Sequence, residues 1–174
     1  MALFNLFSRS PLTLRELVNV DEGRKERSLS QSVTLDKIYH KIRKETVWDR
    51  IKSIFKRSNS TLNMYYVVLR FNVSSSSGNM YTVLIEFQPN PDLNSLMSNK
   101  VKVYCECPSF KYHSAYYLNK RGNLYRSSST DIELDKALTE APDPKKTHVS
   151  PCCKHVFACI SWIDKNIDYL IRNI

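Results

Sequence analysis

The sequence predicts an α+β fold in which a three-stranded antiparallel sheet is followed by a C-terminal helix. Two patterns support this prediction. Between residues 64 and 105, runs of alternating side chains have the two-residue period of β-strands. Between residues 151 and 174, apolar residues recur at alternating four- and three-residue steps, as in a helix with one buried face. With 174 residues and 42% hydrophobic content, the chain is long enough for one compact domain with an extension or for two small domains, and we expect a single core.

Ahead of the sheet, the sequence predicts an N-terminal arm over residues 1–33 and an amphipathic helix over residues 34–60. The arm alternates short apolar clusters with basic stretches, so we expect it to need a partner surface. From residue 34 to residue 57 apolar residues recur at three- and four-residue steps, with Lys and Arg between them. This helix is expected to present a docking face, either within the domain or against a neighbouring subunit, made of Leu35, Ile38, Ile42, Trp48, Ile51 and Phe55.

The three predicted strands cover residues 64–73, 80–88 and 100–105. In the first, Tyr65, Val67 and Leu69 fall on one face, and polar Arg70 and Asn72 fall on the other. The sequence SSSSGN between the first two strands predicts a hairpin connection that is longer than the tightest type. The three strands therefore form an antiparallel meander.

Two helices and an insert are expected after the sheet. Residues 108–120 fit a short helix with Pro108 in its first turn, and Gly122 stands where a C-terminal cap is often found. Residues 122–150 are rich in Ser, Thr, Pro and charge, which indicates an insert loop with at most one helical turn near residues 131–138. The last helix has its apolar stripe at Val156, Ile160, Ile163, Ile167 and Leu170.

The chain is basic, with a formal charge of +9 and a pI near 9.3, which favours an acidic or polyanionic partner such as nucleic acid. The first 60 residues contribute +6 of this charge, from 13 Lys and Arg against 7 Asp and Glu. We find neither a signal-peptide pattern nor a run of about 18 apolar residues, so we expect a cytoplasmic protein with no membrane partner. In that compartment, closely spaced Cys and His are metal ligands more often than disulfide partners.

Two pairs of metal-ligand residues share a one-residue spacing. Cys105 and Cys107 end the third predicted strand, and Cys153 and His155 begin the last helix. Side chains at positions i and i+2 of an extended segment point to the same side, so each pair can face one ion. Structural Zn²⁺ favours a closed tetrahedron of sulfur and nitrogen. The sequence therefore predicts a structural zinc site within residues 61–174, made of these four residues.

Several alternatives accompany this site. Cys152 could take the place of Cys153, and Cys159 is expected to pack as a small apolar residue. The four residues could also be reduced core cysteines with a surface histidine. A catalytic Cys–His pair is disfavoured, because such pairs usually come from separate parts of a fold. Since four protein ligands leave zinc no open position, we expect neither catalysis nor a small-molecule substrate.

The ligand spacing and its flanks resemble the SWIM-type zinc finger, which has the pattern Cys-x-Cys followed by Cys-x-His. The likeness lies in CECPSF and CKHVFACI, with proline after the second Cys, Lys between the last two ligands and an apolar helix behind. It covers roughly residues 100–165 and favours Cys153 over Cys152. The 45 residues between Cys107 and Cys153 make a long insert for this family. More weakly, FKYHSAYYLNKRG after the Cys-x-Cys is similar to small zinc-binding proteins encoded among the structural genes of tailed bacteriophages.

These resemblances imply a non-enzymatic structural or interaction protein, held together by zinc and docked on other subunits of a phage virion (head, neck, tail or baseplate). It would lie in the cytoplasm of the producing cell and in the virion. The alternative is a DNA- or RNA-binding SWIM module, because aromatic faces stack on bases and cations follow phosphates. Its contact residues would be Lys111, Tyr112, Tyr116, Lys120 and Arg121. Against this, the aromatic residues of that helix could bury a face formed by Phe110, Ser114, Tyr117 and Leu118.

Overall fold

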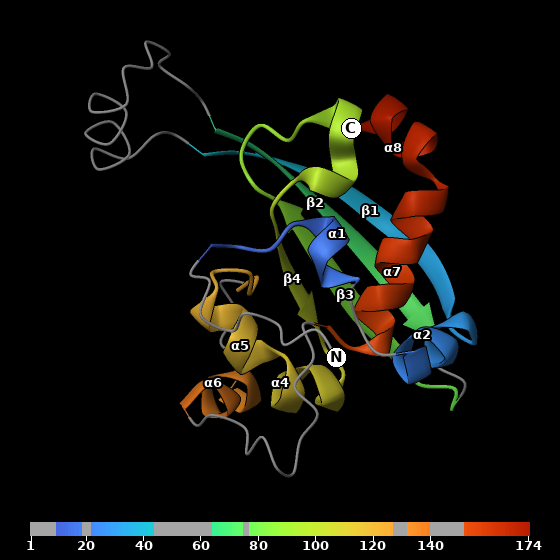
Figure 1. Cartoon of the computed structure of the whole chain (residues 1–174), viewed down its shortest axis with the longest axis vertical. Coiled ribbons are helices and arrows are strands. Elements are labelled where there is room, and N and C mark those ends of the chain that lie inside the picture. The colour runs from blue at the N-terminus through green and yellow to red at the C-terminus, as the bar shows by residue number, and fades with distance from the viewer. Residues whose placement is uncertain (1–9, 19–21, 44–63, 75–76, 127–131, 140–151) are drawn as a thin grey trace.

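The computed structural model of the chain describes residues 10–18, 22–43, 64–74, 77–126, 132–139 and 152–174. These residues form an α+β fold around one four-stranded antiparallel sheet in the order β1-β2-β3-β4 (Figure 1). The strands are β1 (Ser32–Arg43), β2 (Met64–Ser74), β3 (Met80–Phe87) and β4 (Val101–Cys105). The helices are α1 (Leu14–Leu17), α2 (Glu22–Leu29), the 3₁₀ helix η1 (Leu93–Ser98), α4 (Pro108–His113), α5 (Ala115–Lys120), α6 (Ile132–Thr139), α7 (Lys154–Lys165) and α8 (Ile167–Asn173).

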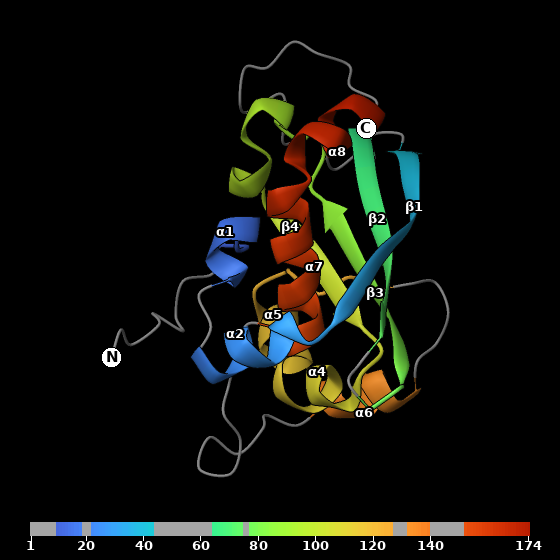
Figure 2. The ribbon, with the colours of Figure 1, turned by 90° about the vertical axis from the view of Figure 1, so that its right-hand side faces the viewer.

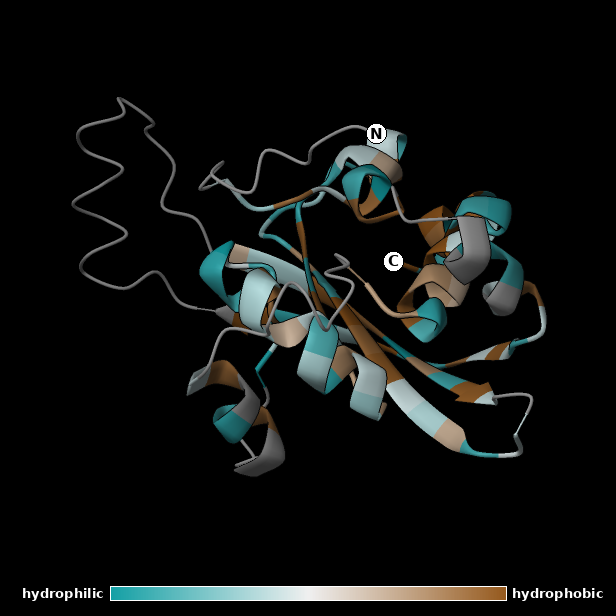
Figure 3. Cartoon of the chain, turned by 60° about the horizontal axis from the view of Figure 1, so that its bottom comes forward, coloured by the Kyte–Doolittle hydropathy of each residue, from teal (hydrophilic) through white to brown (hydrophobic). Residues whose placement is uncertain are grey.

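The core lies between α7 and one face of the sheet, which we call the inner face. Helix α7 contacts all four strands, and α1, α8 and η1 lie on the same side (Figure 2). The inward side chains of β2, β3 and β4 are fully buried except for the partly buried Tyr65 and Tyr81, and hydrophobic residues mark the middle of the sheet in Figure 3. On α7, Trp162 packs edge-on against Phe71 of β2, with ring centroids 5.5 Å apart. Burial of the apolar side chains between α7 and the sheet stabilises the fold mainly through the hydrophobic effect.

The three predicted strands are confirmed with shifts of one residue at their ends. They correspond to β2, β3 and β4. The sheet nevertheless has four strands, because residues 32–43 form β1, which pairs with the edge of β2 that β3 does not occupy.

The helix predicted from residue 34 is therefore wrong through residue 43, and a β-bulge explains the misleading pattern. The β1–β2 register shifts between Leu35 and Lys37, so that β1 contains one extra residue there. Leu35 lies opposite Phe71 and Ile38 lies opposite Leu69, so both face inward although they are three residues apart. A three-residue step is typical of a helix, but here a bulged strand produces it.

The predicted docking face is accordingly not a helix face in the described part of the chain. Leu35 and Ile38 are half-buried against the core of the same chain, whereas Ile42 is 70% exposed near the end of β1. Trp48, Ile51 and Phe55, with the rest of the predicted helix after residue 43, lie outside the described residues.

Part of the predicted arm belongs to the core. Leu12, Leu14 and Leu17 are buried, and α1 begins with a capping box in which Thr13 and Glu16 bond to each other's backbone N–H. The backbone N–H of Leu14 donates to the carbonyl of Asn99 at 3.0 Å. These three leucines thus need no partner subunit to bury them; residues 1–9 lie outside the described range.

The later helices differ in detail from the prediction. The helix expected over residues 108–120 breaks at Ser114 into α4 and α5, and the last helix breaks at Asn166 into α7 and α8. Helix α6 has eight residues where at most one turn was expected. Gly122 has φ +73° and forms the predicted cap after α5. Within the described ranges, no helix is long and apolar enough to cross a bilayer.

Candidate metal centre

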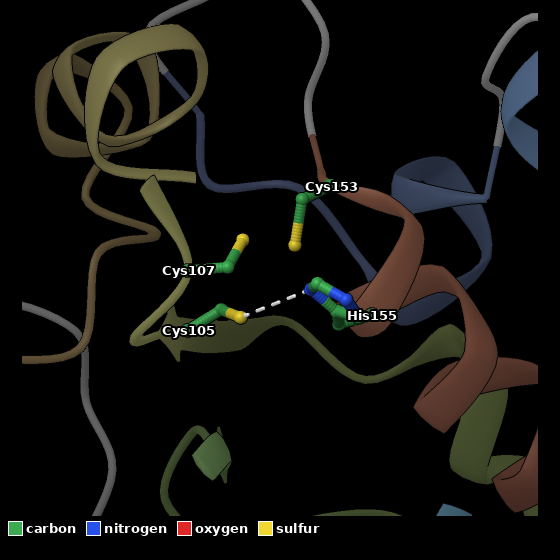
Figure 4. Close-up of side chains that lie close together, drawn as sticks. All are labelled: Cys105, Cys107, Cys153 and His155. Carbon is green, nitrogen blue, oxygen red and sulfur yellow. Dashed lines mark hydrogen bonds between the residues drawn. The ribbon is translucent and has the colours of Figure 1, made fainter. Parts of the chain in front are cut away.

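The four predicted ligands come from two places where a strand or loop meets a helix. Cys105 is the last residue of β4, and Cys107 is the N-cap of α4, where Pro108 starts the helix. Cys153 is the N-cap of α7, and His155 lies in the first turn of that helix. Figure 4 shows these side chains converging from the end of β4 and from α7.

The donor atoms are close enough to hold a metal ion. The three sulfurs and the imidazole nitrogen all lie within 4.8 Å of one another. The Nδ1 atom of His155 is 3.8 Å from the sulfur of Cys105. Around tetrahedral zinc, with Zn–S near 2.3 Å, neighbouring sulfurs would be about 3.8 Å apart. The donors therefore fit a tetrahedral ion after small side-chain adjustments.

Burial isolates this cluster from solvent. Cys105, Cys107 and Cys153 are at most 2% exposed, and His155 is 3% exposed. The imidazole packs on the ring of Tyr81, with centroids 4.7 Å apart, and its buried Nε2 atom has no hydrogen-bond partner among the described residues. An imidazole in a core is costly unless its nitrogens are satisfied. A metal on Nδ1 would satisfy one of them and leave the proton on Nε2.

The three thiols of the cluster have different pKa values in the absence of a metal ion. Hydrogen bonding from the Cys105 thiol lowers the pKa of Cys107, and the backbone N–H of Phe110, 3.3 Å from the Cys107 sulfur, lowers it further. Burial raises the pKa of Cys105 and of Cys153 well above the ordinary thiol value. One thiolate is thus favoured in this site, and a cation is needed to stabilise three.

The other two cysteines lie outside the cluster. The Cys152 thiol donates to the carbonyl of Leu17 at 3.2 Å, while Cys153 takes the position among the donors. Cys159 is fully buried, and burial raises its pKa, so it remains a neutral thiol that packs like a small apolar residue.

The predicted nucleic-acid contacts on α4 and α5 divide into buried and exposed sets. Phe110, Ser114 and Leu118 are fully buried, which matches the burial alternative; Tyr117 is half-buried. Tyr112 is 56% exposed, and the exposed Lys120 places its Nζ 5.5 Å from the centre of the half-buried Tyr116 ring. Lys111 and Arg121 are half-buried.

Asn123, which the sequence did not mark as important, has a buried side chain that joins three segments. Its Oδ1 atom accepts from the backbone N–H of Leu12 at 2.7 Å. Its Nδ2 atom donates to the carbonyls of Leu12 and Val101, at 2.9 and 2.6 Å. The preceding Gly122 signals a helix end, but nothing local in the sequence indicates partners this far away.

Comparisons of the chain with protein-family models, with curated proteins and with solved structures found no match.

Proposed function

We propose that this chain is a non-enzymatic interaction protein in which a structural Zn²⁺ ion joins β4 to α7. The observation that supports it best is the buried cluster of Cys105, Cys107, Cys153 and His155, drawn from two distant parts of the sequence. When bound, zinc would supply a cross-link between these parts and neutralise the thiolates.

The donor set favours zinc over other metals. Three thiolates and one imidazole in a tetrahedral arrangement suit Zn²⁺, whereas Mg²⁺ and Ca²⁺ prefer oxygen ligands. Four protein donors would complete the tetrahedron, so no position would remain for water or substrate. A structural role follows from this closed shell.

The resemblance to SWIM-type fingers supports the same reading and extends it to partners. On that resemblance we propose that the chain is a SWIM-like module, and, from the weaker likeness, a component of a tailed-phage particle that docks on neighbouring subunits. The burial of Leu14 and Leu17 within the chain removes part of the reason for docking through the arm. Mass spectrometry of purified phage particles from the organism that encodes the chain tests this assignment. Absence of the chain from every particle would contradict the assignment.

The zinc proposal is tested by a matched pair of substitutions. Cys105→Ser removes a donor, whereas Cys152→Ser changes an equally buried cysteine whose hydroxyl replacement can still donate to Leu17. Elemental analysis combined with native mass should find one zinc per chain in the wild type and in Cys152→Ser, and none in Cys105→Ser. Equal zinc contents in both variants would contradict the proposed ligand set.

A second candidate function is nucleic-acid binding, favoured by the charge of +9 and by the exposed Tyr112 and Lys120 on α4 and α5. It predicts an affinity that falls steeply with salt concentration.

A further inference from the structure

The side of the sheet opposite α7 presents tyrosines and cations in neighbouring positions. We call it the outer face; its residues include Lys37, Tyr39, Lys41, Tyr66, Arg70, Lys102 and Tyr104. The strand register places them in rows across the sheet, because directly opposed residues of an antiparallel pair point to the same side. Lys37 lies opposite Arg70, and Lys41 lies opposite Tyr66. Among the described residues, no helix covers this side of β1 and β2 (Figure 2).

Lysines and aromatic rings are in contact on this face. The Nζ atom of Lys37 is 5.1 Å from the centre of the Tyr39 ring. The Nζ atom of Lys41 is 5.1 Å from the ring centre of Tyr125, which follows the short bridge beside β4, and it donates to the hydroxyl of Tyr125 at 2.8 Å. Both lysines are exposed, and the tyrosines are half-buried, so the rings are held in place while part of their surface stays accessible.

The positive charge of the outer face is concentrated on β1. Arg70 pairs with Asp36 at 3.1 Å, and Lys102 pairs with Glu86 at 3.8 Å. Neither Lys37 nor Lys41 forms an ion pair with a described residue. At about 3.4 Å per residue, these two lysines are about 14 Å apart along the strand. They can therefore contact separate phosphates of one extended chain.

We propose that the outer face binds single-stranded nucleic acid, with bases stacked on Tyr39 and Tyr66 and phosphates on Lys37 and Lys41. Sites of this kind combine cations that follow the backbone with aromatic rings that stack on bases. A duplex keeps its bases stacked internally, and an acidic protein surface would use the lysines but not the rings. The four residues named in the proposal lie on β1 and β2, whereas the metal ligands come from β4 and from the starts of α4 and α7, so the proposal does not depend on the identity of the metal.

The test measures binding of a fluorescein-labelled oligothymidylate of about 20 nucleotides by fluorescence anisotropy, at salt concentrations from about 50 mM upward. The first variant is Lys37→Gln with Lys41→Gln. Its matched control is Lys165→Gln with Arg172→Gln, which removes the same charge from α7 and α8 on the opposite side. The second variant is Tyr39→Thr, with Tyr39→Phe as its conservative partner. A third variant, Tyr112→Ser with Lys120→Gln, alters the exposed face of α4 and α5.

The proposal expects wild-type binding that weakens with salt, and a plot of log K against log salt whose slope falls by about 1.4 in the lysine variant. Tyr39→Thr should bind roughly tenfold more weakly, while Tyr39→Phe and the opposite-side control should bind like the wild type. Zinc content, measured on each sample, should not change, which separates this test from that of the metal site.

Four results would overturn the proposal. The first is no binding of the single strand at about 50 mM salt, and the second is tighter binding of the corresponding duplex than of the single strand. The other two are an equal loss of affinity in the lysine variant and its charge control, and a loss of affinity confined to the α4 and α5 variant.

Discussion

Asn123 shows how one buried amide can determine where a distant segment lies. Three hydrogen bonds of its side chain hold Leu12 against Val101. Each partner is a backbone group in the interior, and such a group is destabilising when it is left unsatisfied. The chemistry of Cys and His is visible in their residue types, so the metal cluster could be predicted; an asparagine gives no such indication.

We expect Asn123→Ala to lower the free energy of unfolding by about 3 kcal/mol, because it leaves buried backbone groups without partners. Urea unfolding of the metal-loaded protein, followed by circular dichroism, measures this change. Asn119→Ala, at an exposed position on α5, is the control. A loss of less than about 0.5 kcal/mol in Asn123→Ala would show that these hydrogen bonds contribute little.

The unequal thiols of the cluster predict a proton count. In the metal-free protein at pH 7, the raised pKa values keep Cys105 and Cys153 protonated, and the lowered pKa keeps Cys107 ionised. Zinc binding should therefore release about two protons, and its affinity should fall as the pH falls, because protons then compete with the metal. Titration calorimetry in buffers of different ionisation enthalpy measures the number. Release of none or of three would contradict the assignment.

At the scale of elements, β1 and α5 illustrate opposite outcomes of sequence reasoning. The bulge of β1 places Leu35 and Ile38 on one face at a helical spacing, so the local pattern was ambiguous and only pairing with β2 decides it. The end of α5 was predictable, because its determinant is local. The backbone N–H of Gly122 donates to the carbonyl of Asn119, and the backbone N–H of Asn123 donates to the carbonyl of Leu118. These two bonds form a Schellman motif, which requires a positive φ at Gly122.

Substitution of Gly122 should therefore reveal a backbone effect. A Cβ atom at this position would meet Pro11 at an ordinary contact distance of 3.8 Å, so the cost comes from φ and not from crowding. We expect Gly122→Ala to lower the free energy of unfolding by about 1 kcal/mol, and Gly122→Asn to lower it less, because Asn tolerates this conformation better. Thermal unfolding of the two variants ranks them; equal losses would contradict this explanation.

For the whole molecule, the main correction concerns its N-terminal segment. The sequence shows that Leu12, Leu14 and Leu17 are apolar, but it does not show that the sheet-and-helix core has room for them. In the structure they extend the core beside η1 and β4, so the predicted arm and the predicted sheet domain share one hydrophobic interior. Packing between segments this distant is a tertiary property, and periodicity within either segment does not contain it.

This shared interior predicts that Leu14→Ala lowers the free energy of unfolding by about 2–5 kcal/mol, as expected for a fully buried leucine. Arg15→Ala, on the exposed side of the same turn, should change it by less than about 0.5 kcal/mol. Unfolding should remain a single transition that strand and helix signals report together. A separate early transition for the N-terminal segment would show that it is not part of the core.

Removal of the metal should destabilise the whole molecule as well. With free zinc at about 1,000 times its dissociation constant, the ion stabilises the folded chain by about 4 kcal/mol. A chelator should therefore lower the melting temperature of the wild type and of Cys152→Ser, and it should leave that of Cys105→Ser unchanged. Calorimetry measures the three shifts in melting temperature. An unchanged melting temperature of the wild type after addition of the chelator would contradict a stabilising role for the ion.

The two halves of the metal centre are far apart in the sequence, and this separation affects how much the length of the segment between them can vary. Residues 107 and 153 have 45 residues between them in the sequence, and both side chains lie in the same cluster of donors. The entropic contribution to the free energy of closing such a loop grows only with the logarithm of the loop length, by about 0.6 kcal/mol for each doubling. Foreign sequence inserted after residue 126 should consequently be accepted at small thermodynamic expense, which makes this stretch a natural location for a reporter or an affinity tag.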